Sequence, residues 1–137
     1  MGSDILNNKA QTINRCVKRV IDEYGADPDN LKNYTKQDAI ILNILRACEA
    51  CIDAAMHIIA EKKLGLPQNS RDAFEMLNEN GILDNEIVAK LKPMVGFRNI
   101  AVHDYKSVNI NIVKEIIEKH LIDFIAFANI IIKIDNI

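Results

Sequence analysis

The stretch that decides the fold is TKQDAIILNILRACEACIDAAMHIIAEKKLG, residues 35–65. Its apolar residues recur at spacings of three and four, which places them on one face of a helix; they stand at positions 41, 44, 45, 48, 52, 55, 56 and 59. Thr35 is a suitable N-cap, and Asp38 stands where the acid of a capping box would lie. Gly65 supplies a stop. The pattern predicts one long amphipathic helix over residues 35–64.

Further helices are predicted on both sides of this one. Apolar spacing and turn residues delimit them at about residues 4–24, at 70–81, from residue 84 into the segment around residue 100, and at about 111–134. Pro93 lies inside the fourth segment and should kink it or begin a new helical turn. The expected fold is all-α, a bundle of four to five helices in a single domain over residues 1–137.

The last predicted helix is apolar on nearly every side between residues 121 and 134. A helix that is apolar all round needs cover on all sides. A chain of 137 residues cannot easily bury a terminal helix so completely. We therefore expect a homodimer, in which buried apolar surface contributes about 25 cal/mol per Å². The alternative is a single-chain bundle with this helix at its centre.

Composition limits the classes of function. Apolar residues make up 49% of the chain and charged residues 26%, which is typical of a globular domain. The net charge of −2 argues against a protein whose whole surface coats nucleic acid. The first twenty residues lack the apolar core of a secretory signal, and the most apolar stretch is too short to span a membrane. Three cysteines make no disulfide framework. We expect a cytoplasmic protein that does not associate with membranes.

The segment GFRNIAVHDY, residues 96–105, gathers the residues best suited to chemistry. It places Arg98, Asn99, His103 and Tyr105 at the end of the fourth predicted helix. Asn99 and His103 are one helical turn apart and share a face. Arg98 and His103 differ by about 140° around a straight helix. Either the helix ends near residue 102, which lets His103 swing round, or two copies of the segment meet across a dimer.

An arginine and a histidine together suit metal-independent cleavage of RNA. Arginine offers a permanent charge and a planar fork of donors to phosphate, and histidine exchanges a proton near neutral pH. A base that takes the proton of the 2′-hydroxyl starts the attack on the adjacent phosphate, and a cation stabilises the charge that develops on its oxygens. Asn99 could orient the phosphate or the imidazole. We expect neither a metal ion nor a cofactor.

Local charge agrees with this chemistry, although a structural interpretation exists. Residues 90–106 carry four cations and one anion in a chain of net charge −2. A positive segment on an otherwise acidic protein is typical of a small phosphate site. On spacing alone, however, an arginine and a histidine near a helix end are more often a C-terminal cap and dipole partners.

Two other features of the long helix need an interpretation. Cys48 and Cys51 form C-x-x-C on a helix with no second pair, so we interpret them as small apolar residues of a buried stripe. Glu49 interrupts that apolar stretch, and a carboxylate there needs a cation or hydrogen-bond donors. The sequence predicts that Glu49 pairs with Arg98 or Arg71.

The run GFRNIAVHDY resembles the R-x4-H-x-Y signature of the HepT-like toxins, a branch of the HEPN superfamily. Residues 49–77 are also similar to the family's second and third helices, at His57, Gly65, Pro67, Arg71, Phe74 and Leu77. The resemblance implies a HEPN bundle that acts as a homodimer, with its active site in the cleft between the protomers. It implies a metal-independent ribonuclease toxin in which Arg98 and His103 are catalytic and Asn99 is the polar residue after the arginine.

The same resemblance implies a partner and a modification. The partner is a minimal nucleotidyltransferase antitoxin of the MntA type, which would transfer AMP groups to the motif tyrosine, here Tyr105. A phenol that bears anionic nucleotides two residues from His103 would fill the RNA site and repel its phosphates. The alternative is a non-catalytic HEPN dimer that binds a nucleotide or the nucleotidyltransferase. Toxicity that His103→Ala relieves would favour the enzyme.

Overall fold

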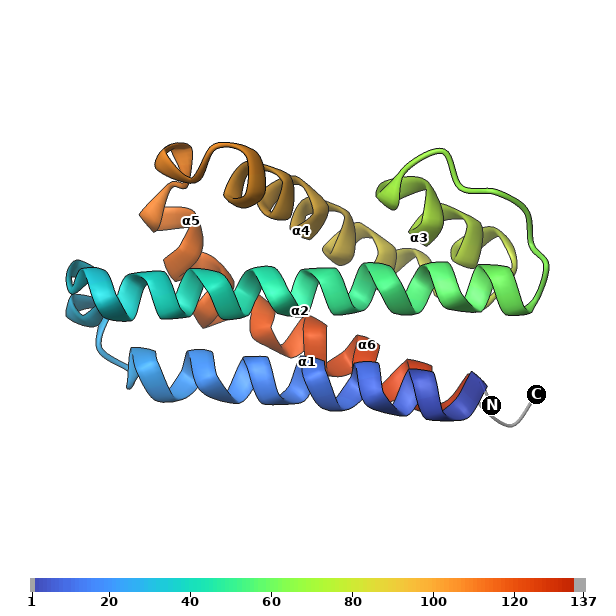
Figure 1. Ribbon diagram of the computed structural model, residues 1–137, viewed down its shortest axis with the longest axis horizontal. Helices are drawn as coiled ribbons and strands as arrows, with labels where there is room; N and C mark the ends of the chain where they lie inside the picture. Colours follow the sequence, from blue (N-terminus) through green and yellow to red (C-terminus); the bar gives the residue numbers. More distant parts are fainter. Residues whose placement is uncertain (1, 135–137) are drawn as a thin grey trace.

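Four long helices run alternately up and down to form the bundle (Figure 1). The computed structural model describes residues 2–134, with side chains from residue 4 onward. The long helices are α1 (Gly2–Tyr24), α2 (Tyr34–Glu61), α4 (Asn85–His103) and α6 (Leu121–Lys133). α3 (Ser70–Glu79) is inserted between α2 and α4. No strand occurs in this described part of the chain, so the predicted all-α bundle is confirmed.

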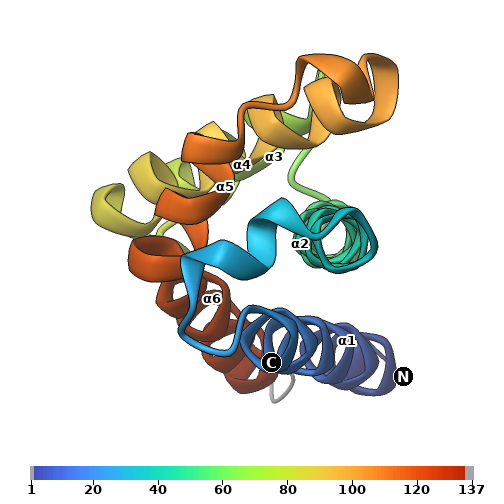
Figure 2. The same cartoon turned by 90° about the vertical axis from the view of Figure 1, so that its left-hand side faces the viewer.

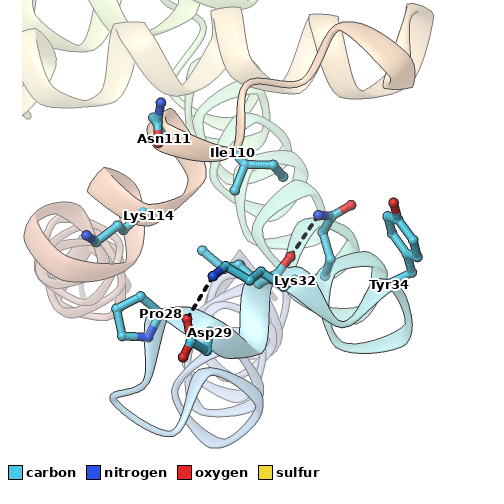
Figure 3. Close-up of a pocket in the computed structure, with 9 residues that line it drawn as sticks. Pro28, Asp29, Lys32, Tyr34, Ile110, Asn111 and Lys114 are labelled. Carbon is cyan, nitrogen blue, oxygen red and sulfur yellow. Dashed lines mark hydrogen bonds and ion pairs between the residues drawn. The ribbon is translucent and has the colours of Figure 1, made fainter.

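Short helical elements make the connections. η1 (Pro28–Lys32) joins α1 to α2, and η2 (Tyr105–Ser107) follows α4. α5 (Ile110–Glu115) and the π-helical turn η3 (Ile116–His120) then lead directly into α6. η1 contacts α5 at one end of the bundle (Figure 3). Seen from that end, α1 and α6 lie on one side of α2, and α3 and α4 lie on the other (Figure 2).

The beginning of α2 differs from the prediction. Asn33, not Thr35, is the N-cap, because its side-chain oxygen accepts a hydrogen bond from the backbone N–H of Lys36 at 3.1 Å. The helix thus begins two residues earlier than predicted, and the carboxamide satisfies the N–H of the third helical residue. The helix also ends at Glu61, before the predicted residue 64. The backbone of Lys63 has a φ of 54°, which no helix allows, so the chain leaves the helix there.

Pro93 lies inside α4 and does not begin a new helical segment, which was one of the two predicted outcomes. The helix is continuous from Asn85 to His103. A proline in a helix deprives the carbonyl four residues earlier of its partner, here Ala89. Both Pro93 and Ala89 are exposed, so water can satisfy that carbonyl. Arg98, Asn99 and His103 therefore lie on one uninterrupted helix, and Tyr105 follows it in η2.

α6 buries one face within its own chain. Leu121, Phe124, Phe127 and Ile131 are buried, and the ring of Phe127 packs edge-to-face on Phe74 with 6.0 Å between centroids. The outer row remains exposed, namely Ile122 at 69%, Ile125 at 36% and Ile132 at 40%. The single chain thus covers more of this helix than the sequence suggested, because α1, α2 and α4 all contact it.

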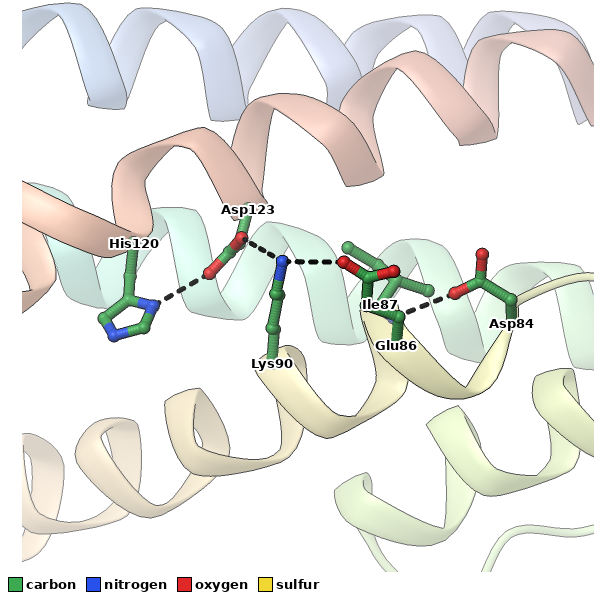
Figure 4. A network of polar contacts seen from close by, with 6 residues as sticks. All are labelled: Asp84, Glu86, Ile87, Lys90, His120 and Asp123. Carbon is green, nitrogen blue, oxygen red and sulfur yellow. Dashed lines mark hydrogen bonds and ion pairs between the residues drawn. The ribbon is translucent and has the colours of Figure 1, made fainter.

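A buried carboxylate joins α6 to α4. Asp123 is 4% exposed, and its oxygens lie 2.9 Å from Nδ1 of His120 and 3.8 Å from Nζ of Lys90 (Figure 4). Lys90 is also 3.2 Å from Glu86. The hydrogen bond with Glu86, and then the charges of Glu86 and Asp123, raise the pKa of Lys90. A buried charge needs such partners, and this cluster fixes the helix that carries the motif against α6.

Candidate active site

The end of α4 decides how the motif residues face. His103 is the last helical residue, and Asp104 ends the helix with φ −152° and ψ 69°. The helix thus ends within one residue of the predicted position, but His103 keeps its place in the last turn and does not swing round. Arg98 and His103 remain about 140° apart around the axis. In one chain the guanidinium and the imidazole face different sides of α4.

Arg98 faces α2. Its Nη2 lies 3.4 Å from Oε2 of Glu49, and its Nη1 donates to Oδ1 of Asn99 at 3.1 Å. The predicted pairing of Glu49 is thus confirmed, with Arg98 as the cation. The two side chains are 29% and 43% exposed, so the ion pair stabilises the fold little. Nε of Arg98 is buried and has no hydrogen-bond partner among the described residues.

His103 is exposed on the other side of the helix. Among the residues with described side chains, none makes a hydrogen bond or ion pair with its imidazole. Asn99 lies one turn earlier on the same face and contacts Arg98. The imidazole can therefore exchange protons with solvent or a ligand, and Asn99 lies between the two functional groups.

A second guanidinium lies on the His103 side of α4, and sequence reasoning gave it no role in the site. A Cβ at Gly96 would meet Nη2 of Arg71 at 2.9 Å, so the arginine of α3 lies directly on this glycine. Nε of Arg71 donates to the carbonyl of Lys92 at 3.5 Å. Gly96 is two turns before His103 on the same face. The sequence signal for this contact was the glycine inside the predicted helix, because such a glycine indicates that another group packs closely against the backbone. The sequence does not show which group that is.

Tyr105 is bound to the start of α2. Its hydroxyl donates to Oδ1 of Asp38, and the ring is 43% exposed. Burial, then the hydrogen bond and charge of Asp38, raise the pKa of Tyr105 to about 12. Asp38 therefore makes a tertiary contact instead of the predicted capping box. The phenol is protonated at neutral pH and accessible from outside.

The positive segment is more neutralised than the sequence suggested. Lys90 pairs with Glu86, Lys92 pairs with Glu75, and Arg98 pairs with Glu49. Of the cations in residues 90–106, Lys106 alone has no ion pair within the described structure. Glu86 precedes Lys90 by one turn of α4, whereas Glu49 and Glu75 come from α2 and α3, which a count along the chain cannot bring to this segment.

The cysteines are confirmed as core residues. Cys48 and Cys51 are each 2% exposed, and burial raises the pKa of both thiols. No group of three or more metal-ligating side chains is found in the described part of the chain. Likewise, none of the helices described has the length and apolar character that crossing a membrane requires.

Comparison with known proteins gives concordant results. Residues 13–131 match the family "Ribonuclease HepT-like". The chain is 46% identical to the mRNA nuclease HepT of Shewanella oneidensis, over 94% of this chain and 97% of the relative. It superposes with a TM-score of 0.87 and 48% identity on a tri-AMPylated Shewanella oneidensis HEPN toxin in complex with MNT antitoxin, covering 93% and 96% of the two chains. A toxin–antitoxin structure with AMP-PNP gives a TM-score of 0.89 at 46% identity, covering 93% and 97%.

Proposed function

This chain belongs to the HepT-like ribonuclease family, and on that basis we propose that Arg98, Asn99 and His103 cleave RNA without a metal ion. The observation that carries the assignment is the exposed imidazole of His103, which has no partner in the described residues and shares its face with Asn99. The substrate is messenger RNA. Because growth depends on intact messenger RNA, its cleavage makes the protein a toxin, which acts in the cytoplasm.

The cleavage follows from the residue types. The imidazole of His103 takes the proton of a 2′-hydroxyl, and that oxygen attacks the adjacent phosphorus. The guanidinium of Arg98 stabilises the charge on the phosphate oxygens, and Asn99 orients the phosphate. The bond to the 5′-oxygen breaks, that oxygen takes up a proton, and a 2′,3′-cyclic phosphate remains. DNA lacks the 2′-hydroxyl and is spared.

The site is composed of two protomers. Arg98 and His103 leave one α4 in directions about 140° apart, which favours a site that takes one of the two groups from a second protomer. Ile100 and Val102 lie between them in sequence and are each 46% exposed, and Leu42 on α2 is 42% exposed. Apolar side chains exposed beside a functional motif suit an interface. In a two-fold pair formed there, Arg98 of one protomer meets the partner's His103.

The activity is controlled by a nucleotidyltransferase partner of the MntA type, which transfers AMP to Tyr105. A relative with 48% identity is described as tri-AMPylated and in complex with MNT antitoxin. In the present chain the Tyr105 hydroxyl is accessible and two residues from His103. An AMP group there adds negative charge and bulk beside the RNA site, so RNA is repelled.

Tyr105→Phe tests this control. The variant should cleave RNA at the wild-type rate, because the phenol oxygen takes no part in the cleavage, but it should gain no mass when incubated with ATP and the nucleotidyltransferase. Expression of the variant should therefore stay toxic even when the partner is co-expressed. Intact-protein mass spectrometry and growth curves measure the two effects. Modification of the variant at another residue would contradict the assignment.

Gly96→Ala tests the contribution of Arg71. The added methyl displaces Nη2, the far end of a flexible side chain, so the fold should be retained. Replacement of a helical glycine should even stabilise α4 by up to about 1 kcal/mol. We propose that Arg71, which lies on the His103 side of α4, contacts a phosphate of the RNA, so its displacement should weaken RNA binding and reduce the salt dependence by about one ion. Urea unfolding measures the stability. Binding to a non-cleavable RNA at several salt concentrations measures the affinity and its salt dependence. Unchanged RNA binding would contradict a role for Arg71.

A further inference from the structure

A trough of two pockets runs beside Tyr105, between the start of α2 and the segment from η2 to α5. The inner pocket, about 380 Å³, has Tyr105 and Asp38 in its wall. The outer pocket, about 410 Å³, extends to Lys114. Each volume is in the range of small-molecule sites. The pockets adjoin, because they share Tyr34, Gln37 and Ile110.

The lining of the trough combines an aromatic ring with cations. Tyr34 stands between the two pockets and is 79% exposed. Lys106 lines the inner pocket, and Lys114 lines the outer one opposite Lys32 (Figure 3). Lys32 is held 3.2 Å from Asp29, whereas no ion pair within residues 4–134 engages Lys106 or Lys114. A ring for stacking and ammonium groups for phosphate are the two elements of a site for nucleotides.

We propose that this trough holds the nucleotides attached to Tyr105. The inference rests on the proposed function, which makes Tyr105 the acceptor. In the transfer, the phenol oxygen forms a bond to the α-phosphorus of ATP, and the bond from that phosphorus to the bridging oxygen breaks. Pyrophosphate leaves, and the phenol proton passes to Asp38, which already accepts the hydrogen bond of the hydroxyl, and from Asp38 to water, which restores the carboxylate.

Electrostatics then direct the product along the trough. Before the transfer, the Tyr105 hydroxyl donates to Asp38. Afterwards the oxygen has no proton to donate, and the attached phosphate is an anion that the carboxylate repels. Lys106 is the cation in the wall of the same pocket, and Lys114 is the next one along. The phosphates therefore follow these two lysines, and a base stacks on Tyr34 between them.

Protection from digestion tests this inference. The wild-type protein and its variants are modified with ATP by the nucleotidyltransferase, repurified and digested with a 3′-phosphodiesterase, and intact mass follows the loss of AMP. Tyr34→Ala should lose AMP about 5- to 150-fold faster than the wild type, which is the range that one base–aromatic stack supplies. Tyr34→Phe keeps the ring and should restore protection. Lys114→Ala should also lose AMP faster, whereas Lys133→Ala, which removes an exposed cation outside the trough, should not.

The outcomes separate the inference from the function on which it rests. Equal rates of AMP loss in the wild type and Tyr34→Ala would overturn the trough as the nucleotide site. The proposal would also be overturned if Tyr34→Ala weakened RNA binding of the unmodified protein as strongly as it speeds AMP loss. The trough would then bind the RNA substrate and not the attached nucleotides. If wild-type Tyr105 gains no mass, the proposed modification fails, and this inference fails with it. Because Tyr34 is an exposed side chain, its replacement leaves the fold intact.

Discussion

Replacement of His103 by alanine should lower RNA cleavage by about 10²- to 10⁴-fold, the usual contribution of a positioned general base. Arg98→Ala should cost about 10²- to 10³-fold, because the charge that develops on the phosphate loses its cation. His103 is exposed and without a hydrogen-bond partner in the described part of the structure, so the free energy of unfolding should change by less than about 0.5 kcal/mol. A fluorescent RNA assay measures the cleavage rates, and urea unfolding measures the free energy of unfolding.

Two controls make this result specific. His120→Gln removes the half-exposed imidazole that pairs with Asp123 and should leave the cleavage rate unchanged, although it loosens that contact. EDTA should not affect the wild-type rate, because no step uses a metal ion. Cleavage by His103→Ala at the wild-type rate, or loss of wild-type cleavage in EDTA, would rule out the proposed chemistry.

The second large effect concerns the protomer interface. Val102→Lys should raise the dimer dissociation constant by at least about 100-fold, because the interface would have to bury two unpaired charges, one from each protomer. Lysine is the better choice than glutamate, since a carboxylate at this position would pair with Arg98 one turn earlier. The helical content should be unchanged, because Val102 is 46% exposed in the single chain. Sedimentation should show a monomer, and cleavage should fall with it.

The control variant addresses the other apolar surface. Ile122 on α6 is 69% exposed, and the sequence alone favoured a dimer that covers this helix. Ile122→Lys should remain a dimer and cleave RNA normally if the interface lies on α4. A monomeric Ile122→Lys beside a dimeric Val102→Lys would place the interface on α6 and would refute the composite site.

Local pattern is sufficient to predict the helices of this chain but not how they meet. The period of α2 and the gap at residues 25–34 are properties of neighbouring residues, so the bundle could be predicted. The N-cap of α2 could not, because Asn33 and Thr35 both suit that position and the choice depends on how η1 packs. Pro93 was expected to kink α4 or to begin a new helical turn, whereas the exposure that lets the helix continue through it is a tertiary property.

The candidate site was predictable to a similar extent. The motif and the pairing of Glu49 with a cation could be predicted, because a carboxylate in an apolar stripe requires one. The choice of Arg98 over Arg71, the position of Arg71 on Gly96 and the bond from Tyr105 to Asp38 join residues from different helices. The pairing of Lys92 with Glu75 belongs to the same class, whereas that of Lys90 with Glu86 lies within α4. Such contacts depend on helix packing, which no spacing within one segment encodes.

The central claim is that Arg98 of one protomer and the partner's His103 act on the same phosphate. It is tested most directly by mixing Arg98→Ala and His103→Ala chains, each inactive alone, under conditions where protomers exchange. Random pairing makes half of the dimers mixed, and each mixed dimer has one complete site of two, so about one quarter of the wild-type activity should return. If the mixture cleaves RNA no faster than the two variants separately, the site does not combine residues of two protomers.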